Sequence, residues 1–129
     1  MRFLPLLFLL FFLSGCLLLS GEETSIDLVD QSGILSTTFV SGEGSEERTL
    51  RVSEGPTTLQ VIVIVGVESG DLQIEILQPD GAVVFALAAQ PDSQLTRSSW
   101  VRSDDQGQIR YRVTARGARN GSYQIFVQP

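Results

Sequence analysis

Apolar and polar residues alternate with a period of two along most of the chain after residue 25. The clearest case is Ile109, Tyr111 and Val113, which alternate with glutamine and arginine, and the segments 72–76 and 123–127 follow the same rule. This period places successive side chains on opposite faces of an extended backbone, as in half-buried β-strands. No window repeats its apolar residues at the helical period of about 3.6 positions. We therefore predict an all-β domain.

The segment from Thr58 to Val67 is apolar at every position of its centre, Val61-Ile62-Val63-Ile64-Val65. A strand with two apolar faces either is covered on both sides or lies in the middle of a sandwich. Both arrangements make this segment a central element of the fold.

Turn-forming residues separate the predicted strands at short intervals. Glu68-Ser69-Gly70-Asp71, Pro79-Asp80-Gly81 and Asn120-Gly121 each supply a fixed proline φ or a residue that tolerates positive φ, so we predict hairpin turns there. The predicted strands number eight or nine, at 25–29, 34–40, 47–52, 57–67, 71–78, 82–88, 97–102, 108–115 and 122–128. Short strands without helices predict a single antiparallel β-sandwich of jelly-roll type, in which the weakly patterned segment 89–99 forms a longer loop.

The first residues have the layout of an export signal. An apolar run, interrupted only by a proline, extends from Phe3 to Leu13. It follows the single basic residue Arg2, and small residues come after it. Its end, Leu13-Ser14-Gly15-Cys16, resembles the lipobox of bacterial lipoproteins. The resemblance implies that the thiol of Cys16 receives a diacylglyceryl group and that the chain is cut just before it.

This resemblance divides the chain into a signal peptide at 1–15, a lipidated cysteine with a short tether at 16–25, and a β-sandwich at 26–129. Two or three acyl chains would hold the protein permanently on the cell membrane or outer membrane, outside the cytoplasm. The tether reaches no more than about 30 Å. Two alternatives remain open: a transmembrane anchor that continues through Leu19, and a secreted protein with an incidental cysteine. Cys16 is the only cysteine, so an internal disulfide is excluded.

A second resemblance covers residues 45 to 129. The segments Gly70 to Gly81, Gly107 to Val113 and Gly121 to Val127 occur in an order similar to that of the bacterial pre-peptidase C-terminal domain. That family is a jelly-roll-like β-sandwich appended to secreted proteins, and the resemblance implies the same fold here. This chain lacks both the accompanying peptidase and the acidic cluster that binds calcium in collagen-binding members, so the resemblance implies no activity.

Composition argues against catalysis. The chain has no histidine and no lysine, and its one cysteine is expected to be acylated, so the common nucleophile and base pairs are absent. Two facing carboxylates, as in glycoside hydrolysis, are the remaining alternative, with Glu75, Asp104 and Asp105 as candidates. We predict that this protein is not an enzyme and needs no cofactor.

Aspartates at predicted turns raise the question of a metal site. Asp71, Asp80, Asp104 and Asp105 could offer oxygen ligands to a hard cation such as Ca²⁺. Aspartate is equally favoured in turns because its side chain bonds to nearby backbone groups, and no segment has EF-hand spacing. We therefore predict no metal.

Charge is unevenly distributed along the sequence. From Glu22 to Asp92 the chain carries thirteen of its fifteen acidic residues, whereas six of its nine arginines follow Ser93. Two interpretations of Arg110 and Arg112 remain open. They pair across strands with Glu75 and its neighbours, or they form a basic face that binds phosphate, an anionic glycan or an acidic partner. The net charge of −6 argues against nucleic acid as a partner.

Trp100 is the only tryptophan and alternates with Ser98 and Arg102. It is either a core residue or an exposed aromatic side chain that stacks on a sugar ring or anchors a protein interface.

Our first functional hypothesis is a non-catalytic envelope lipoprotein whose β-sandwich contacts an unidentified envelope protein near the membrane. It requires a contiguous apolar or arginine-rich patch on one sheet. The alternative is a carbohydrate or small-ligand binding module, which requires Trp100 to be exposed beside polar groups in a groove.

Overall fold

The computed structural model describes residues 16–129, which form one antiparallel sheet of seven strands. The strands are β1 (Leu18–Ser20), β2 (Glu23–Val29), β3 (Ser32–Arg51), β4 (Thr58–Leu77), β5 (Val83–Ala89), β6 (Leu95–Arg102) and β7 (Gln108–Gln128). Within this range no helix has the length and apolar character needed to span a membrane. The predicted all-β, antiparallel fold is confirmed.

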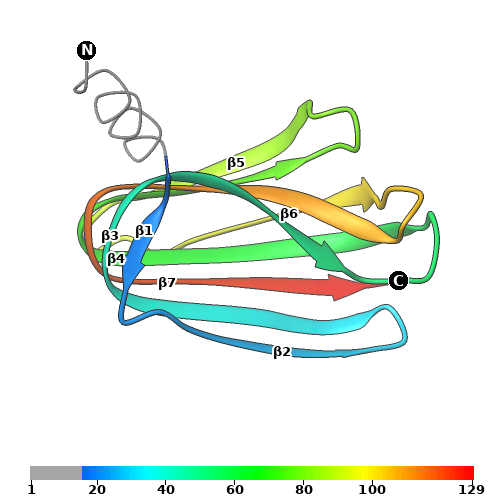
Figure 1. Cartoon of the computed structure of the whole chain (residues 1–129), viewed down its shortest axis with the longest axis horizontal. Helices are drawn as coiled ribbons and strands as arrows, with labels where there is room; N and C mark the ends of the chain where they lie inside the picture. Colours follow the sequence, from blue (N-terminus) through cyan, green and yellow to red (C-terminus); the bar gives the residue numbers. More distant parts are fainter. Residues whose placement is uncertain (1–15) are drawn as a thin grey trace, which may run out of the picture.

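Three strands are long enough to take part in two layers. β3 and β4 have 20 residues each and β7 has 21, and all three turn over at the same end of the molecule (Figure 1). β7 pairs with β3 on one side and with β4 on the other along nearly its whole length. The sheet therefore folds onto itself, and the two halves of these strands form the two walls of a sandwich.

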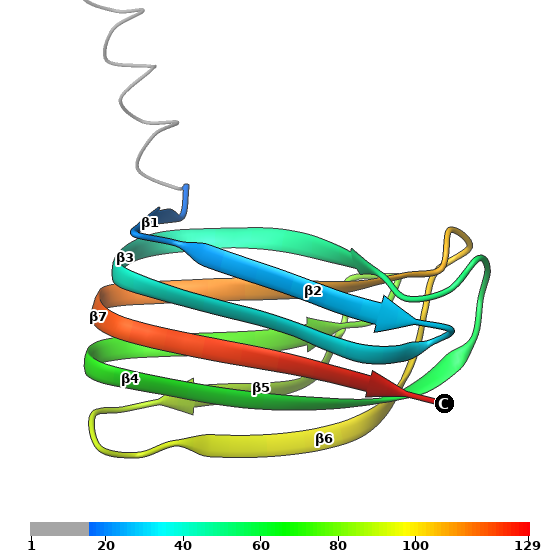
Figure 2. The same ribbon diagram turned by 90° about the horizontal axis from the view of Figure 1, so that it is seen from below.

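The five-stranded layer has the order β2-β3-β7-β4-β6 and contains residues 32–41, 119–128 and 58–67 of the three long strands. It faces the reader in Figure 2. The four-stranded layer has the order β3-β7-β4-β5 and contains residues 44–51, 108–116 and 71–77. β1 pairs with β3 next to the bend.

Glycines allow the three strands to bend together. The β3–β7 register shifts between Gly42 and Gly44, and the β4–β7 register shifts between Ser69 and Asp71, as expected for β-bulges. Gly70, inside the second shift, has a φ of +79°, which strongly disfavours residues with a side chain. A Cβ atom at Gly70 would also collide with the backbone carbonyl of Gly117 on β7.

The core lies between the two layers. Val61, Val63 and Val65 of β4 are fully buried and face the inward side chains of the four-stranded layer. The other large, fully buried side chains are Leu59, Leu72, Ile74, Ile76, Leu77, Val101, Ile109, Tyr123 and Ile125. The segment 58–67 is a central strand, as predicted, because it pairs with both β6 and β7. Ile62 and Ile64 are half-buried on its outer face.

The predicted strands were correctly placed, but two predicted turns were wrong. Glu68–Asp71 and Asn120-Gly121 lie inside the continuous strands β4 and β7, where they form part of the shared bend. Pro79–Gly81 does form the predicted turn, since the Gly81 N–H donates to the Gln78 carbonyl at 2.8 Å. The predicted loop at 89–99 is shorter, because β6 begins at Leu95.

The N-terminal part of the described chain also differs from expectation. Residues 16–25 were predicted to be a tether, yet Leu18–Ser20 pair with β3 as β1 and β2 begins at Glu23. Leu17 is buried in the core, which explains why this segment lies against the domain. The predicted signal peptide at 1–15 lies outside the described residues.

The bend gives a matched pair of glycine substitutions. We expect Gly70→Ala to lower the free energy of unfolding by about 3 kcal/mol or more, because it combines positive φ with a backbone collision. Gly117 has a φ of +55° but open space around its missing side chain, so Gly117→Ala should cost only about 1–2 kcal/mol. Urea denaturation of both variants measures the difference. Equal losses would show that the collision at Gly70 does not limit the bend.

Candidate functional site

The outer face of the five-stranded layer carries the exposed Trp100 and several half-buried apolar side chains. We call it the Trp100 face and define it by Ile34, Gln60, Ile62, Ile64, Trp100, Gln124, Phe126 and Gln128. The strand register places Gln60 of β4 between Trp100 of β6 and Gln128 of β7. Two residues along, Ile62 lies opposite Phe126, which lies opposite Ile34 of β3. The face therefore spans four neighbouring strands.

Trp100 is 59% exposed, so the interpretation as a core tryptophan is wrong. Its inward neighbour Val101 is buried, which shows that the alternation of β6 turns the indole outwards. Beside it, the Gln128 side-chain amide donates to the Gln60 side-chain oxygen at 2.5 Å. The indole thus lies next to a fixed amide pair, on an open sheet face and not in a groove.

The centre of the Trp100 face carries no charge. The outward positions of β3, β7 and β4 in this layer are hydroxyl, amide, glycine or apolar residues. The charged groups Glu23 and Asp27 of β2 and Arg102 of β6 lie at the rim. Charged side chains make up 19% of the whole sequence, and none of them lies at this centre. A neutral ligand could cover this centre without burying an unpaired charge.

The two arginines singled out in the sequence lie on the opposite outer face. Arg112 lies between Glu47 and Glu75, with nitrogen–oxygen distances of 2.8 and 3.4 Å. Its hydrogen bond to Glu47 raises the pKa of Arg112. These are the cross-strand pairs expected under the first interpretation, so Arg112 does not offer an unopposed positive charge. Arg110 lies between Thr49 and Leu77. The structure does not bring either arginine to Trp100.

A polar cluster at the open edge between the layers was not predicted. Arg48 of β3 points inwards, and its guanidinium donates to Glu22 at 2.6 Å, Glu46 at 3.2 Å and the Tyr123 hydroxyl at 3.3 Å. Tyr123 packs edge-on against Tyr111, with ring centroids 6.1 Å apart. The cluster ties the β1–β2 turn to both layers. Its sequence signal is the alternation of Gly44, Glu46, Arg48 and Leu50, in which charged residues share a face with a buried leucine.

Burial and hydrogen bonding shift the pKa values of this cluster. Burial by itself lowers the pKa of Arg48, but the hydrogen bond to Glu22, reinforced by Tyr123 and Glu46, outweighs it and raises the pKa above its usual range. Burial raises the pKa of Tyr111, and the neighbouring Tyr123 adds to the shift. Arg48 therefore stays charged and Tyr111 stays neutral, a pairing suited to holding structure.

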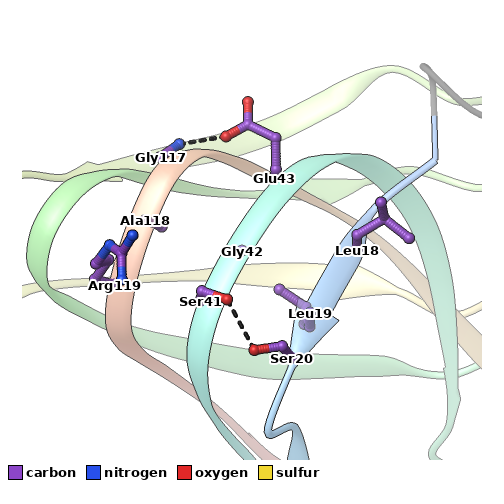
Figure 3. A pocket seen from close by; sticks show the side chains of 9 residues that line it. All are labelled: Leu18, Leu19, Ser20, Ser41, Gly42, Glu43, Gly117, Ala118 and Arg119. Carbon is purple, nitrogen blue, oxygen red and sulfur yellow. Dashed lines mark hydrogen bonds between the residues drawn. The ribbon is translucent and has the colours of Figure 1, made fainter.

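A cavity of about 480 Å³ lies beside the bend, between β1 and the long strands (Figure 3). Leu18 and Leu19 form one wall, and Ser20 bonds to Ser41 at 2.8 Å. The Glu43 carboxylate accepts a hydrogen bond from the Gly117 N–H at 2.6 Å, so it caps the bulge of β7. Cys16 is exposed at this same end, with its carbonyl next to Gly44.

Two of the four aspartates considered as metal ligands accept structural hydrogen bonds in turns. Asp80 accepts from the Ala82 N–H at 2.9 Å, and Asp104 accepts from the N–H groups of Gln106 and Gln108. In the part of the chain that the structure describes, no three acidic or cysteine side chains gather closely enough to hold a metal ion. Glu75, proposed as half of a carboxylate pair, faces Arg112 instead.

Comparison with known proteins finds similar architecture only at very low identity. No family model matches the chain, and no curated protein matches it. The carbohydrate binding module CBM6cm-2 of Cellvibrio mixtus lichenase 5A, solved with cellotriose, has 13% identity, a TM-score of 0.41, and coverage of 87% of this chain and 89% of that one. A Bacillus endospore appendage pilus protein has 9% identity, a TM-score of 0.49, and coverage of 84% and 90%.

The CBM22-1 xylan-binding domain of Paenibacillus barcinonensis Xyn10C has 10% identity and a TM-score of 0.41. The match covers 87% of this chain and 84% of the xylan-binding domain. Similarity at this level is limited to the β-sandwich architecture, and the ligands are those of the other proteins. The lipobox at Cys16 and the pre-peptidase C-terminal resemblance stay predictions.

The buried Tyr111 gives a prediction for alkaline solution. Because its pKa in the folded chain is raised above the ordinary value of 10.0, the folded chain keeps this proton where the unfolded chain loses it. This contribution to stability is complete below pH 10 and is lost as the pH rises from there towards the folded-state pKa. We expect Tyr111→Phe to lose less stability than the wild type between pH 9 and 11 in urea denaturation. Parallel losses in both proteins would contradict this assignment.

Proposed function

We propose that this chain is a non-catalytic binding module whose Trp100 face binds neutral carbohydrate chains. The observation that carries the proposal is an indole that is 59% exposed on a sheet face with an uncharged centre. An aromatic side chain of this size buries a large area at low entropic cost, which makes it an effective anchor for a ligand.

The chemistry of the face suits a sugar ring. The apolar C–H side of a pyranose ring stacks on an indole, while the hydroxyl groups at its rim need donors and acceptors nearby. Gln60 and Gln128 supply both kinds of group directly beside Trp100. Because the centre of the face carries no charge, a neutral ligand can bind there without the free-energy cost of desolvating an unpaired ion.

The dimensions suit a chain of several sugars. Trp100 and Phe126 lie two strands apart and two residues out of register, which corresponds to roughly 12 Å. A linear oligosaccharide laid across β6, β4 and β7 would contact both rings, with Ile62 and the glutamines between them. An open face buries less ligand than a groove, so several such contacts are needed for useful affinity.

A second candidate, an envelope protein partner, is favoured by the apolar row itself. Ile62, Phe126 and Ile34 are half-buried neighbours on three adjacent strands, and nothing in the described chain covers them. Contiguous apolar surface of this kind is common at protein interfaces. The two candidates use the same face but depend on different residues, since stacking needs Trp100 and docking needs the central row.

We also propose that Cys16 is acylated and that the exported protein is held on the cell membrane or outer membrane. Cys16 is exposed at the end of the molecule where the long strands bend. It directly precedes the buried Leu17, and β1 begins at the next residue. An acyl group at this position would keep the bend close to the membrane surface, without the free tether expected from the sequence. The Trp100 face would then extend away from that end along the strands.

Glycan binding has a matched test on the two outer faces. We expect the full chain in detergent to be retained on neutral polysaccharides, and Trp100→Ala to weaken binding by about tenfold, because a stacking contact is lost. Arg112→Ala, on the opposite face, should bind as the wild type does. Quantitative glycan-array and affinity-electrophoresis measurements check both variants.

Three results would decide against a carbohydrate ligand. These are no retention on any neutral glycan, equal binding by wild type and Trp100→Ala, or equal loss in both variants. If a photo-crosslinker at Phe126 instead captures one recurrent envelope protein, and Ile62→Ser abolishes that adduct, the second candidate is correct.

Acylation has its own readout. In a bacterial host fed a clickable palmitate analogue, the wild-type chain should be labelled and found in the membrane fraction. Cys16→Ser should lose the label completely. An unlabelled wild-type chain, or a labelled Cys16→Ser variant, would contradict the proposal.

A further inference from the structure

β5 is a free edge of the four-stranded layer. Val83–Ala89 pair with β4 on one side only, and no described strand lies on the other side (Figure 1). Alternate backbone N–H and C=O groups of an edge strand point away from its sheet and can pair with another extended chain. The surface available here is therefore a ladder of backbone groups, seven residues long.

Proteins usually protect such edges with charged residues, prolines or short strands. Among residues 16–129, the other edges follow this rule. β2 carries Glu23 and Asp27, β6 carries Arg97 and Arg102, residues 44–51 of β3 carry two glutamates and two arginines, and β1 has only three residues. β5 reads Val-Val-Phe-Ala-Leu-Ala-Ala, with no charge, proline or glycine. It is the one long edge in the described chain without protection.

We propose that β5 pairs antiparallel with β5 of a second copy of this chain, around a two-fold axis at Ala86. Pairing must keep inward side chains opposite inward side chains, so the axis passes through a residue and not between two. The axis at Ala86 uses the whole strand: Phe85 lies opposite Leu87 of the second copy, and Val83 lies opposite Ala89. The result is a continuous layer of eight strands with a closed, isologous interface.

The chemistry of β5 favours its own copy as the occupant. A two-fold axis brings each side chain to a residue of the same strand, which would oppose like charges in any charged edge but opposes none here. On the outer face the contact is formed by Ala86 and Ala88, whose small side chains allow close approach, and by Val84. Val83, which is 51% exposed, would be covered. On the inward side of the strand, the guanidinium of the exposed Arg97 lies 5.6 Å from the centre of the Phe85 ring.

The test uses the full chain in detergent, with more than one micelle per protein, and sedimentation equilibrium as the readout. We expect a concentration-dependent dimer. Ala86→Lys places two positive charges on the axis and should raise the dissociation constant at least about tenfold. The folded monomer should tolerate this change, because residue 86 lies opposite Glu75 on β4. Ser25→Lys, an exposed position on the already protected β2, is the matched control and should leave the dimer unchanged.

A monomer at all concentrations, or a dimer equally stable in Ala86→Lys, would overturn the proposal. If Ala86→Lys fails to fold, a second measurement still tests the proposal. In a Cys16→Ser background, Ala86→Cys should form an intermolecular disulfide under mild oxidation, whereas Ser25→Cys should not. Equal cross-linking of the two cysteine variants would again exclude β5 as the interface. Glycan binding and dimer formation are read separately, so either can fail without the other.

Discussion

The shared bend of β3, β4 and β7 is the constraint on which the rest of the structure depends. Each long strand has one apolar face, and a flat sheet of this length would leave that face in water. Folding the sheet at Gly44, Gly70 and Gly117 turns the apolar face onto itself, so the two halves of each strand bury one another's side chains. One structural event creates both the core and the two outer faces.

The two outer faces then differ in how their polar groups are used. On the four-stranded layer, Arg112 lies between Glu47 and Glu75, so its positive charge is paired with carboxylates of the same sheet. On the five-stranded layer, the amides of Gln60 and Gln128 bond to each other beside an exposed indole, and no charged group crosses the centre. On the first face, Arg112 is paired with carboxylates of the same sheet. On the second, the amides of Gln60 and Gln128 keep further hydrogen-bond donors and acceptors for groups in solvent. This difference, and not the fold itself, singles out the Trp100 face.

Local patterns explain what could be predicted from the sequence. Strand positions follow from alternation, which depends only on neighbouring residues. None of the nine predicted segments extends more than one residue beyond β2 to β7. A hairpin turn and a bulge use the same residues, so Ser69-Gly70 and Asn120-Gly121 could not show whether the chain reverses or bends. That choice depends on pairing with distant strands. Likewise, alternation groups Ser98 with Trp100, but burial of the other β6 face rests on Val101 meeting Leu59 across the sheet.

The position of the last strand has a consequence for how the molecule forms. β7 is the central strand of both layers, and β3 and β4 pair with it and not with each other. Partners such as Glu47 and Arg112 are separated by most of the domain, so the fold is dominated by contacts between distant parts of the chain. Until the residues of β7 have been synthesised, β3 and β4 lack their shared partner and the two walls cannot close. Closure of the two walls therefore depends on the last strand of the sheet to be made, and β3 and β4 cannot complete their pairing before it.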